Sequence, residues 1–222
     1  YSGQEVAVAS TKSFSAQLAV LFIVAHQMGY EKGYLSQADV VQAYTDLYAA
    51  SEVLESTMQG YEQDIKNKIA PLYVSARQFI FLGRHITFPL ALEVALKLKE
   101  ISYIFAECYP AGELKHGHIA LIDSEVPVVV FSSADPVIYQ KLLSNAQEVK
   151  ARHGRLIIFL FAGQDELYSL ADVAFVFPQV NPLLAGLAMV GVAQLFVYYL
   201  ALLLGRPIDK PRNLAKTVTV DR

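Results

Sequence analysis

Short apolar runs alternate with longer helical patterns over the second half of the chain. Four runs of five to seven residues predict buried strands, at 78–83, 127–131, 155–161 and 171–177. The intervening residues predict helices at 88–106 and 137–153, with Cys108 within or at the end of the first. Strands that alternate with helices favour an α/β domain, in which a mostly parallel sheet is covered on both faces. Such sheets bind ligands at the carboxyl ends of their strands.

The first third of the chain carries the patterns of two long helices. Residues 11–29 are strongly apolar and predict the first helix. A second helix is predicted to begin at Ser36, in a capping-box pattern, and to run to about Lys68 with a break at Gly60. Pro71 marks a boundary before the strands begin.

One long segment, residues 182–205, contains no charged residue. Its length is enough to cross a bilayer, which takes roughly 18 to 20 apolar residues. Gln194 near its centre and the lack of a second such segment favour a buried helix instead. The pattern alone leaves both interpretations open. A helix that is apolar on all sides needs cover on all sides, so a buried helix here predicts an oligomer.

Composition narrows the classes of function. The chain has 222 residues, of which 54% are hydrophobic and 18% charged, with a formal net charge of −3. The length allows one large or two small domains, and the lack of a basic stripe argues against nucleic-acid binding. One cysteine permits no intramolecular disulfide, and the first residues lack a signal-peptide pattern, so we expect a cytoplasmic protein. Neither metal-ligand spacing nor a dinucleotide motif is present, so we expect no metal and no cofactor.

The helix predicted at 88–106 carries unusually dense charge. Glu93, Lys97 and Glu100 stand at i, i+4 and i+7, so all three project from one face. A carboxylate beside an ammonium group, with His116 a short loop away, supplies groups that move protons at neutral pH. The alternative is a solvated Glu–Lys pair worth a few tenths of a kcal/mol. These residues alone do not decide between the two.

Four motifs in one order connect these features to a known family. They are Val-Ala-Ser-Thr-Lys at 8–12, the charged helix at 91–103, Ala-Gly-Glu-Leu-Lys-His-Gly at 111–117 and the looped or extended tail at 209–220. Together they resemble the isomerase half of the glucosamine-6-phosphate synthase family, the glutamine–fructose-6-phosphate aminotransferases. The resemblance implies an SIS-type fold, a doubly wound parallel sheet flanked by helices, which occurs twice in that half.

The resemblance also divides the chain. Residues 1–72 correspond to the C-terminal part of a first SIS subdomain with its connecting helices, 73–205 to a nearly complete second one, and 206–222 to an active-site tail. It makes 182–205 a buried helix between the sheet and a neighbouring subunit, with no membrane. The family's phosphate-binding loop and glutaminase domain have no match here. We therefore expect a glutaminase domain upstream and no glutamine hydrolysis by this chain alone.

The family's catalytic roles transfer to four positions. Glu100 is the implied base that moves a proton between C1 and C2 of the open-chain sugar. Lys216 is the implied Schiff-base lysine, acting on the C2 carbonyl of fructose 6-phosphate. Lys97 is implied to polarise and protonate sugar oxygens, and His116, reaching the site from the partner of a homodimer, to open the sugar ring.

Three further positions follow from the same resemblance. Val8 and Ser10 are expected to contact the sugar, and Glu93 to orient Lys97. The implied activity is the conversion of fructose 6-phosphate and glutamine-derived ammonia to glucosamine 6-phosphate, the first step of hexosamine (UDP-GlcNAc) synthesis. Two alternatives stay open: another SIS-type phosphosugar isomerase or deaminase, and a non-catalytic SIS module that senses a phosphosugar.

Overall fold

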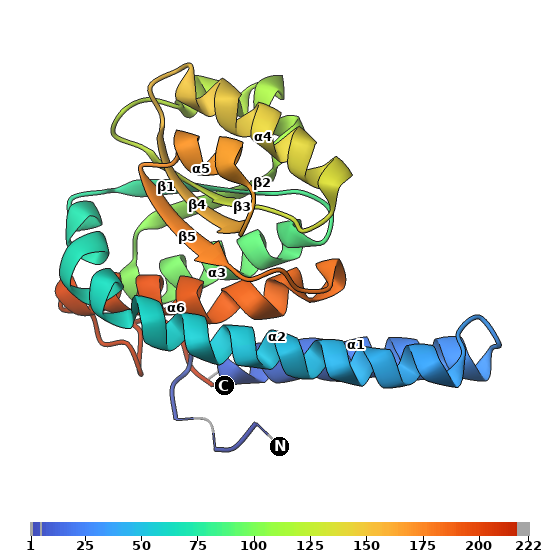
Figure 1. Cartoon of the computed structure of the whole chain (residues 1–222). Helices are drawn as coiled ribbons and strands as arrows, with labels where there is room; N and C mark the ends of the chain where they lie inside the picture. Colours follow the sequence, from blue (N-terminus) through green and yellow to red (C-terminus); the bar gives the residue numbers. More distant parts are fainter. Residues whose placement is uncertain (1, 5, 217–222) are drawn as a thin grey trace.

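The fold is built on one parallel sheet of five strands, in the order β2-β1-β3-β4-β5 (Figure 1). It is seen in a computed structural model that describes residues 2–4 and 6–216. The strands are β1 Gln78–Gly83, β2 Phe105–Pro110, β3 Pro127–Phe131, β4 Arg155–Phe161 and β5 Val173–Phe177. The order reverses between β1 and β3, which makes the sheet doubly wound. The predicted α/β fold is therefore confirmed.

The described part of the chain contains six α-helices. They are α1 Lys12–Glu31, α2 Gln37–Asp64, α3 Thr87–Ser102, α4 Pro136–Lys150, α5 Asp165–Leu170 and α6 Ala185–Leu203. Figure 1 shows α4 and α5 on one face of the sheet and α3 and α6 on the other, with α2 across α6. The hairpin of α1 and the start of α2 extends away from this body.

Side chains of β3 show why both faces are covered. Val128 and Val130 pack into the core beneath α4, whereas Val129 and Phe131 pack into the core that α3 and α6 share. Because successive side chains of a strand point to opposite faces, a run of apolar residues needs a helix layer on each side.

The predicted helix 88–106 was wrong at its end. The helix closes at Ser102, and Tyr103 follows with a φ of 64° in the left-handed region, which stops helical propagation. Residues 105–110 form β2 instead, paired in parallel with β1, and Cys108 lies in this strand rather than in a helix. Burial raises the pKa of the Cys108 thiol to about 12.

The break predicted at Gly60 was also wrong. Helix α2 passes through Gly60 to Asp64, and the first departure from α geometry is the π-helical turn Ile65–Ile69. The capping box at Ser36 is confirmed, since its hydroxyl accepts from the Asp39 N–H while the Asp39 carboxylate accepts from the Ser36 N–H. A favourable cap and long tertiary contacts offset the roughly 1 kcal/mol cost of one helical glycine.

The charge-free segment forms a core helix. Among the described residues, one helical stretch is long enough and apolar enough to cross a membrane, and it is Pro182–Leu203. Within its most apolar 18 residues, 72% are buried in this fold. Helix α6 packs against α2 and α3, so its apolar surface is covered mainly by its own chain. Such burial is typical of the central helix of an α/β domain.

Candidate active site

Helix α3 holds the three charged residues on one face, as predicted. The Lys97 ammonium lies 2.5 Å from Glu100 Oε2 and 3.5 Å from Glu93 Oε1. Lys97 is only 4% exposed. The solvated-pair interpretation is therefore wrong for Lys97, because a buried charge is retained only with partners that compensate its lost hydration.

Glu93 has the less favourable environment of the two carboxylates. Burial raises the pKa of Glu93, and the neighbouring Lys97 ammonium opposes this only in part. Its Oε1 is buried and forms no hydrogen bond in the described part of the chain beyond the 3.5 Å ion pair with Lys97. Glu93 thus contributes a carboxyl group that takes up a proton more readily than an ordinary glutamate.

The amino-terminal segment and the C-terminal tail lie side by side next to this helix. The Val8 N–H donates to the Asp209 carbonyl at 3.0 Å. Lys216 Nζ donates to the Ala7 carbonyl at 3.1 Å. These two bonds place the tail lysine beside the segment that carries Val8 and Ser10. The Ser10 hydroxyl itself lies 2.6 Å from the Ser13 hydroxyl.

Two adjoining hollows share walls made by this segment. One, of about 200 Å³, contains Lys97 and is lined by Ala7, Ala9, Thr11, Lys97, Ile101, Gln194, Val197, Tyr198, Ile208 and Asp209. The other, of about 40 Å³, contains Lys216 and is lined by Val6, Ala7, Ala9, Thr11, Lys12 and Lys216. Ala7, Ala9 and Thr11 belong to both, so one short stretch of backbone separates the two lysines.

Glu100 borders a third hollow, which is larger and more open. Its volume is about 420 Å³, and its walls are Lys99, Glu100, Tyr103, Ile104, Phe105, Arg212, Asn213 and Leu214. The far wall is again the tail. The described tail residues thus line hollows beside both Lys216 and Glu100.

His116 lies apart from this group within one chain. It is exposed, in the 3₁₀ turn Ala111–His116 that follows β2, and it lines none of the three hollows. The other six predicted site residues lie on α3, on the amino-terminal segment or in the tail.

Sequence reasoning missed two features of the site. Gln194 lines the hollow of Lys97, and its Nε2 is buried without a partner among the described residues. The sequence did contain an indication of this role, because Gln194 is the one amide side chain within the charge-free segment 182–205. Tyr103, which contacts the tail, gave no comparable signal.

Among residues 2–4 and 6–216, no group of His, Cys, Asp or Glu side chains could hold a metal ion.

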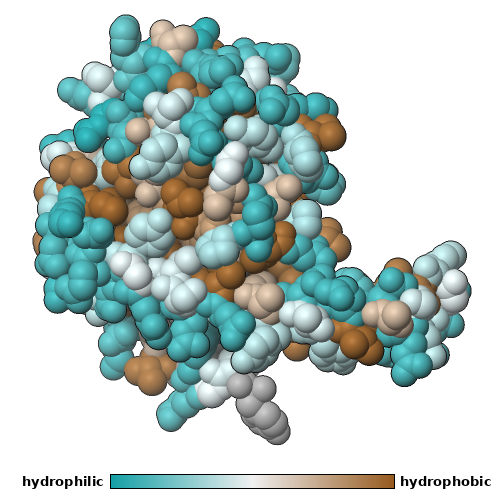
Figure 2. Space-filling view, in the orientation of Figure 1, coloured by the Kyte–Doolittle hydropathy of each residue, from teal (hydrophilic) through white to brown (hydrophobic). Residues whose placement is uncertain are grey.

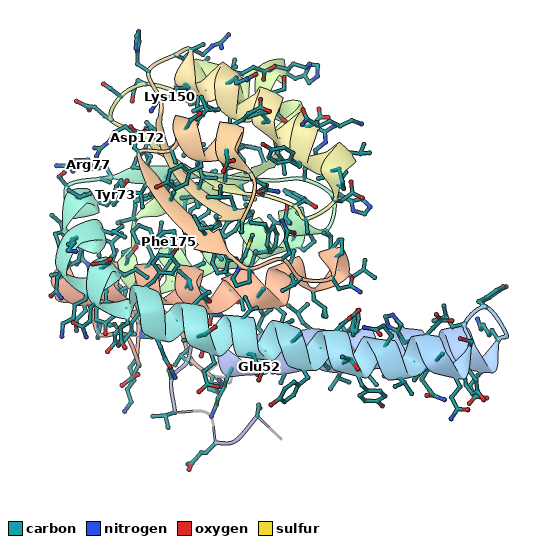
Figure 3. The ribbon with its side chains drawn as sticks, in the orientation of Figure 1. Glu52, Tyr73, Arg77, Lys150, Asp172 and Phe175 are labelled. Atoms are coloured by element: carbon teal, nitrogen blue, oxygen red, sulfur yellow. The ribbon has the colours of Figure 1, made fainter. Side chains whose placement is uncertain are left out.

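A hollow of about 580 Å³ lies at the opposite edge of the sheet. It borders the amino ends of β1, β3 and β4, where Figure 3 shows Tyr73 close to Arg77. Its walls carry charges of both signs, from Arg77, Arg155, Asp123 and Glu125. None of the seven predicted site residues lines this hollow, so it is not the candidate active site.

Comparison with known proteins agrees with the fold. The model of the SIS domain family matches residues 72–204. The chain belongs to the SIS domain family. It is 45% identical over 221 residues to the glutamine–fructose-6-phosphate aminotransferase (isomerizing) of Thermus thermophilus, and 42% identical over 221 residues to that of Aquifex aeolicus. All of the chain is covered in both alignments, but only 36% of each relative.

Solved structures show the same similarity to these aminotransferases. The C-terminal domain of the glucosamine-fructose-6-phosphate aminotransferase of Francisella tularensis superposes with a TM-score of 0.87 at 36% identity, over 94% of this chain and 58% of that one. The resemblance drawn from four motifs is thus confirmed. A glucosamine-6-phosphate deaminase of Thermotoga maritima, at 24% identity and a TM-score of 0.70, shares the fold.

Proposed function

We propose that this SIS chain is the isomerase module of a glutamine–fructose-6-phosphate aminotransferase and forms glucosamine 6-phosphate from fructose 6-phosphate and ammonia. The observation that carries the proposal is the placement of Lys216 beside the segment that also walls the hollow of Lys97, next to Glu100. A sensor of phosphosugars needs no lysine nucleophile and no carboxylate base at such a place.

The first chemical role belongs to Lys216. Its neutral amine adds to the C2 carbonyl of open-chain fructose 6-phosphate, and the carbonyl oxygen leaves as water, which forms a protonated Schiff base. The positive C=N group withdraws electrons from C1 and makes the C1–H bond acidic. Ammonia then displaces Lys216 from C2, so the nitrogen that stays on the sugar comes from ammonia.

The second role belongs to Glu100. Its carboxylate removes the proton from C1 and returns it to C2, which converts C1 to the aldehyde and C2 to the amine-bearing carbon of glucosamine 6-phosphate. Lys97, 2.5 Å from this carboxylate, holds it in place and offers protons to sugar oxygens. Glu93, 3.5 Å from the same ammonium, positions Lys97 from the other side.

The remaining roles concern binding and assembly. Val8 and Ser10 contact the sugar, and His116 opens its ring from the partner subunit of a homodimer. Ammonia comes from a glutaminase domain upstream of this chain. The exposed position of His116 supports this arrangement, since an exposed imidazole is accessible to a neighbouring copy. The module acts in the cytoplasm, in hexosamine synthesis.

Loss of the Glu100 carboxylate tests this division of labour. We expect Glu100→Gln to retain the Schiff base on Lys216 but to lose exchange of the C1 proton of fructose 6-phosphate with D₂O, by about a hundredfold or more. The exchange is followed by NMR in a chimera in which this chain replaces the matching region of the Thermus thermophilus relative. The exposed Glu52→Gln variant is the control. Unchanged exchange in Glu100→Gln would assign the base to another residue.

A further inference from the structure

Tyr103 ends the catalytic helix in a conformation that tyrosine rarely adopts. Its φ is 64°, in the left-handed region, and its N–H closes the last helical turn on the Lys99 carbonyl at 3.2 Å. Left-handed backbone costs a non-glycine residue roughly 1 kcal/mol or more. A glycine or asparagine would fit this position with less strain, so the side chain itself has to account for tyrosine here.

The side chain of Tyr103 is held by the tail at three points. Its hydroxyl accepts a hydrogen bond from the Arg212 N–H at 2.8 Å, across 109 residues of sequence. The guanidinium of Arg212 lies 4.3 Å from the ring centroid and that of Arg206 lies 5.2 Å from it. Both distances are within the roughly 6 Å at which cations interact with aromatic rings.

The tail has a defined turn immediately after this contact. The Leu214 N–H donates to the Pro211 carbonyl at 3.4 Å, and Asn213 adopts a φ of 62°. Lys216 follows two residues after Leu214. The path from the contact on Tyr103 to the Schiff-base lysine is therefore short and partly fixed.

We propose that Tyr103 is a positioning residue for Lys216: by binding Arg212 and Arg206, it holds the tail against α3 so that the amine of Lys216 is presented to the site that contains Glu100. The proposal rests on the proposed function, because it gives Lys216 its chemical role. Tyr103 and Arg212 also wall the hollow beside Glu100, three residues along the helix, so one contact shapes both parts of the site.

The length of chain between Lys216 and its nearest contact sets how much the loss of Tyr103 should lower the local concentration of the Lys216 amine. Lys216 lies four positions after Arg212, which limits their separation to about 14 Å in a fully extended chain. Without the contact on Tyr103, the next backbone hydrogen bond from the described tail to the amino-terminal segment is that of Asp209 with Val8, and seven residues reach about 25 Å. The wider volume lowers the local concentration of the amine about two- to fivefold.

Two substitutions of Tyr103 separate its contacts from the backbone strain. Tyr103→Asn removes the ring and the phenol but keeps a residue that tolerates the left-handed conformation, and Tyr103→Phe removes only the hydroxyl. Tyr168→Asn, at an exposed tyrosine of α5, is the matched control. The rate and final extent of borohydride trapping on Lys216 with fructose 6-phosphate are measured in the chimera. Trypsin cleavage after Arg212, which Asn213 follows, is measured in the 222-residue chain.

We expect Tyr103→Asn to lower the trapping rate about two- to fivefold at an unchanged half-saturating concentration and final extent, with Tyr103→Phe between it and the parent. Cleavage after Arg212 should become faster in the same order. Unchanged trapping and unchanged cleavage in Tyr103→Asn would overturn the proposal. So would a lower final extent with a lower melting temperature at an unchanged rate, since a merely structural role predicts that result.

Failure of the proposed function gives a different result. In that case the parent traps no sugar on Lys216, whatever residue stands at position 103. The trypsin experiment still decides whether Tyr103 holds the tail. Faster cleavage in Tyr103→Asn would support the contact, and unchanged cleavage would overturn it.

Discussion

Lys97 is the only charged residue that is buried among the described residues, and its two carboxylate partners differ in what burial does to them. Burial raises the pKa of Glu93 above its ordinary value of 4.5. A carboxyl group whose pKa is higher in the folded state stabilises the fold below about pH 4.5, and this contribution is lost as the pH rises through the raised pKa.

Replacement of Glu93 should therefore change the pH dependence of stability. The unfolding free energy of the parent minus that of Glu93→Gln should fall as the pH rises from about 4 to about 8, because glutamine does not titrate. Denaturant unfolding at several pH values measures this difference. Glu52→Gln, at an exposed glutamate of α2 labelled in Figure 3, is the control and should not reproduce the fall. A difference that rises with pH would contradict the assigned shift.

The positions of individual site residues were predictable from the sequence only where they depend on residues close by in the chain. The spacing of Glu93, Lys97 and Glu100 gave their common face, because helical periodicity depends on neighbours in sequence. The contact between Tyr103 and Arg212 joins residues 109 positions apart and depends on a left-handed backbone, so no local pattern indicates it.

At the scale of elements, the turn from β1 to α3 fixes where the charged helix begins. A Cβ atom on Gly83 would lie 2.5 Å from the Thr87 carbonyl oxygen and 2.6 Å from Phe88 Cα. These are backbone atoms, so the helix would have to move to relieve the clash. The absence of a side chain at Gly83 lets α3 start directly against the end of the strand.

Two glycine substitutions test this packing. Gly83→Ala should lower the unfolding free energy by about 1–3 kcal/mol, the usual cost of overpacking a core. Gly60→Ala should instead raise it by about 0.5–1 kcal/mol, because Gly60 lies inside α2 and a Cβ there meets nothing within 4 Å. Chemical denaturation of both variants measures the two values. Equal effects of the same sign would show that close approach at Gly83 does not constrain the fold.

Most elements were predictable from period and length, and the exceptions have physical reasons. The four strands with near-continuous apolar runs are central or covered, so their pattern is strong. Strand β2 lies at the edge of the sheet, and Glu107, Tyr109 and Pro110 interrupt its apolar pattern. Pairing with β1 rather than local preference makes these residues a strand.

At the scale of the whole molecule, the protruding hairpin leaves apolar side chains exposed, and Figure 2 shows hydrophobic residues along it. Those of α1 and α2 that are at least 45% exposed include Val20, Leu21, Val24, Met28, Val41, Tyr44 and Tyr48. Such a surface is typical of an interface with another chain or domain. It fits the proposed dimer, in which His116 serves the neighbouring subunit.

Mixing two inactive variants tests whether the site is shared. In the chimera, His116→Ala and Lys216→Ala subunits that exchange freely should form mixed dimers with one intact site, which restores about a quarter of the parent activity. Product formation measures the recovery, and each variant alone is the control. No recovery, with mixed dimers demonstrated by mass spectrometry, would place His116 and Lys216 in the site of one subunit.

The most direct test of the whole account is the nucleophile itself. The chimera and the 222-residue chain are each incubated with fructose 6-phosphate and borohydride, and the modified peptide is identified by mass spectrometry. The account predicts a reduced sugar-phosphate adduct on Lys216 in the chimera, and none in Lys216→Arg. An adduct in the chain alone as well would show that this segment suffices for a competent site. An adduct on another lysine, or none in the chimera, would contradict the Schiff-base assignment and favour the sensor.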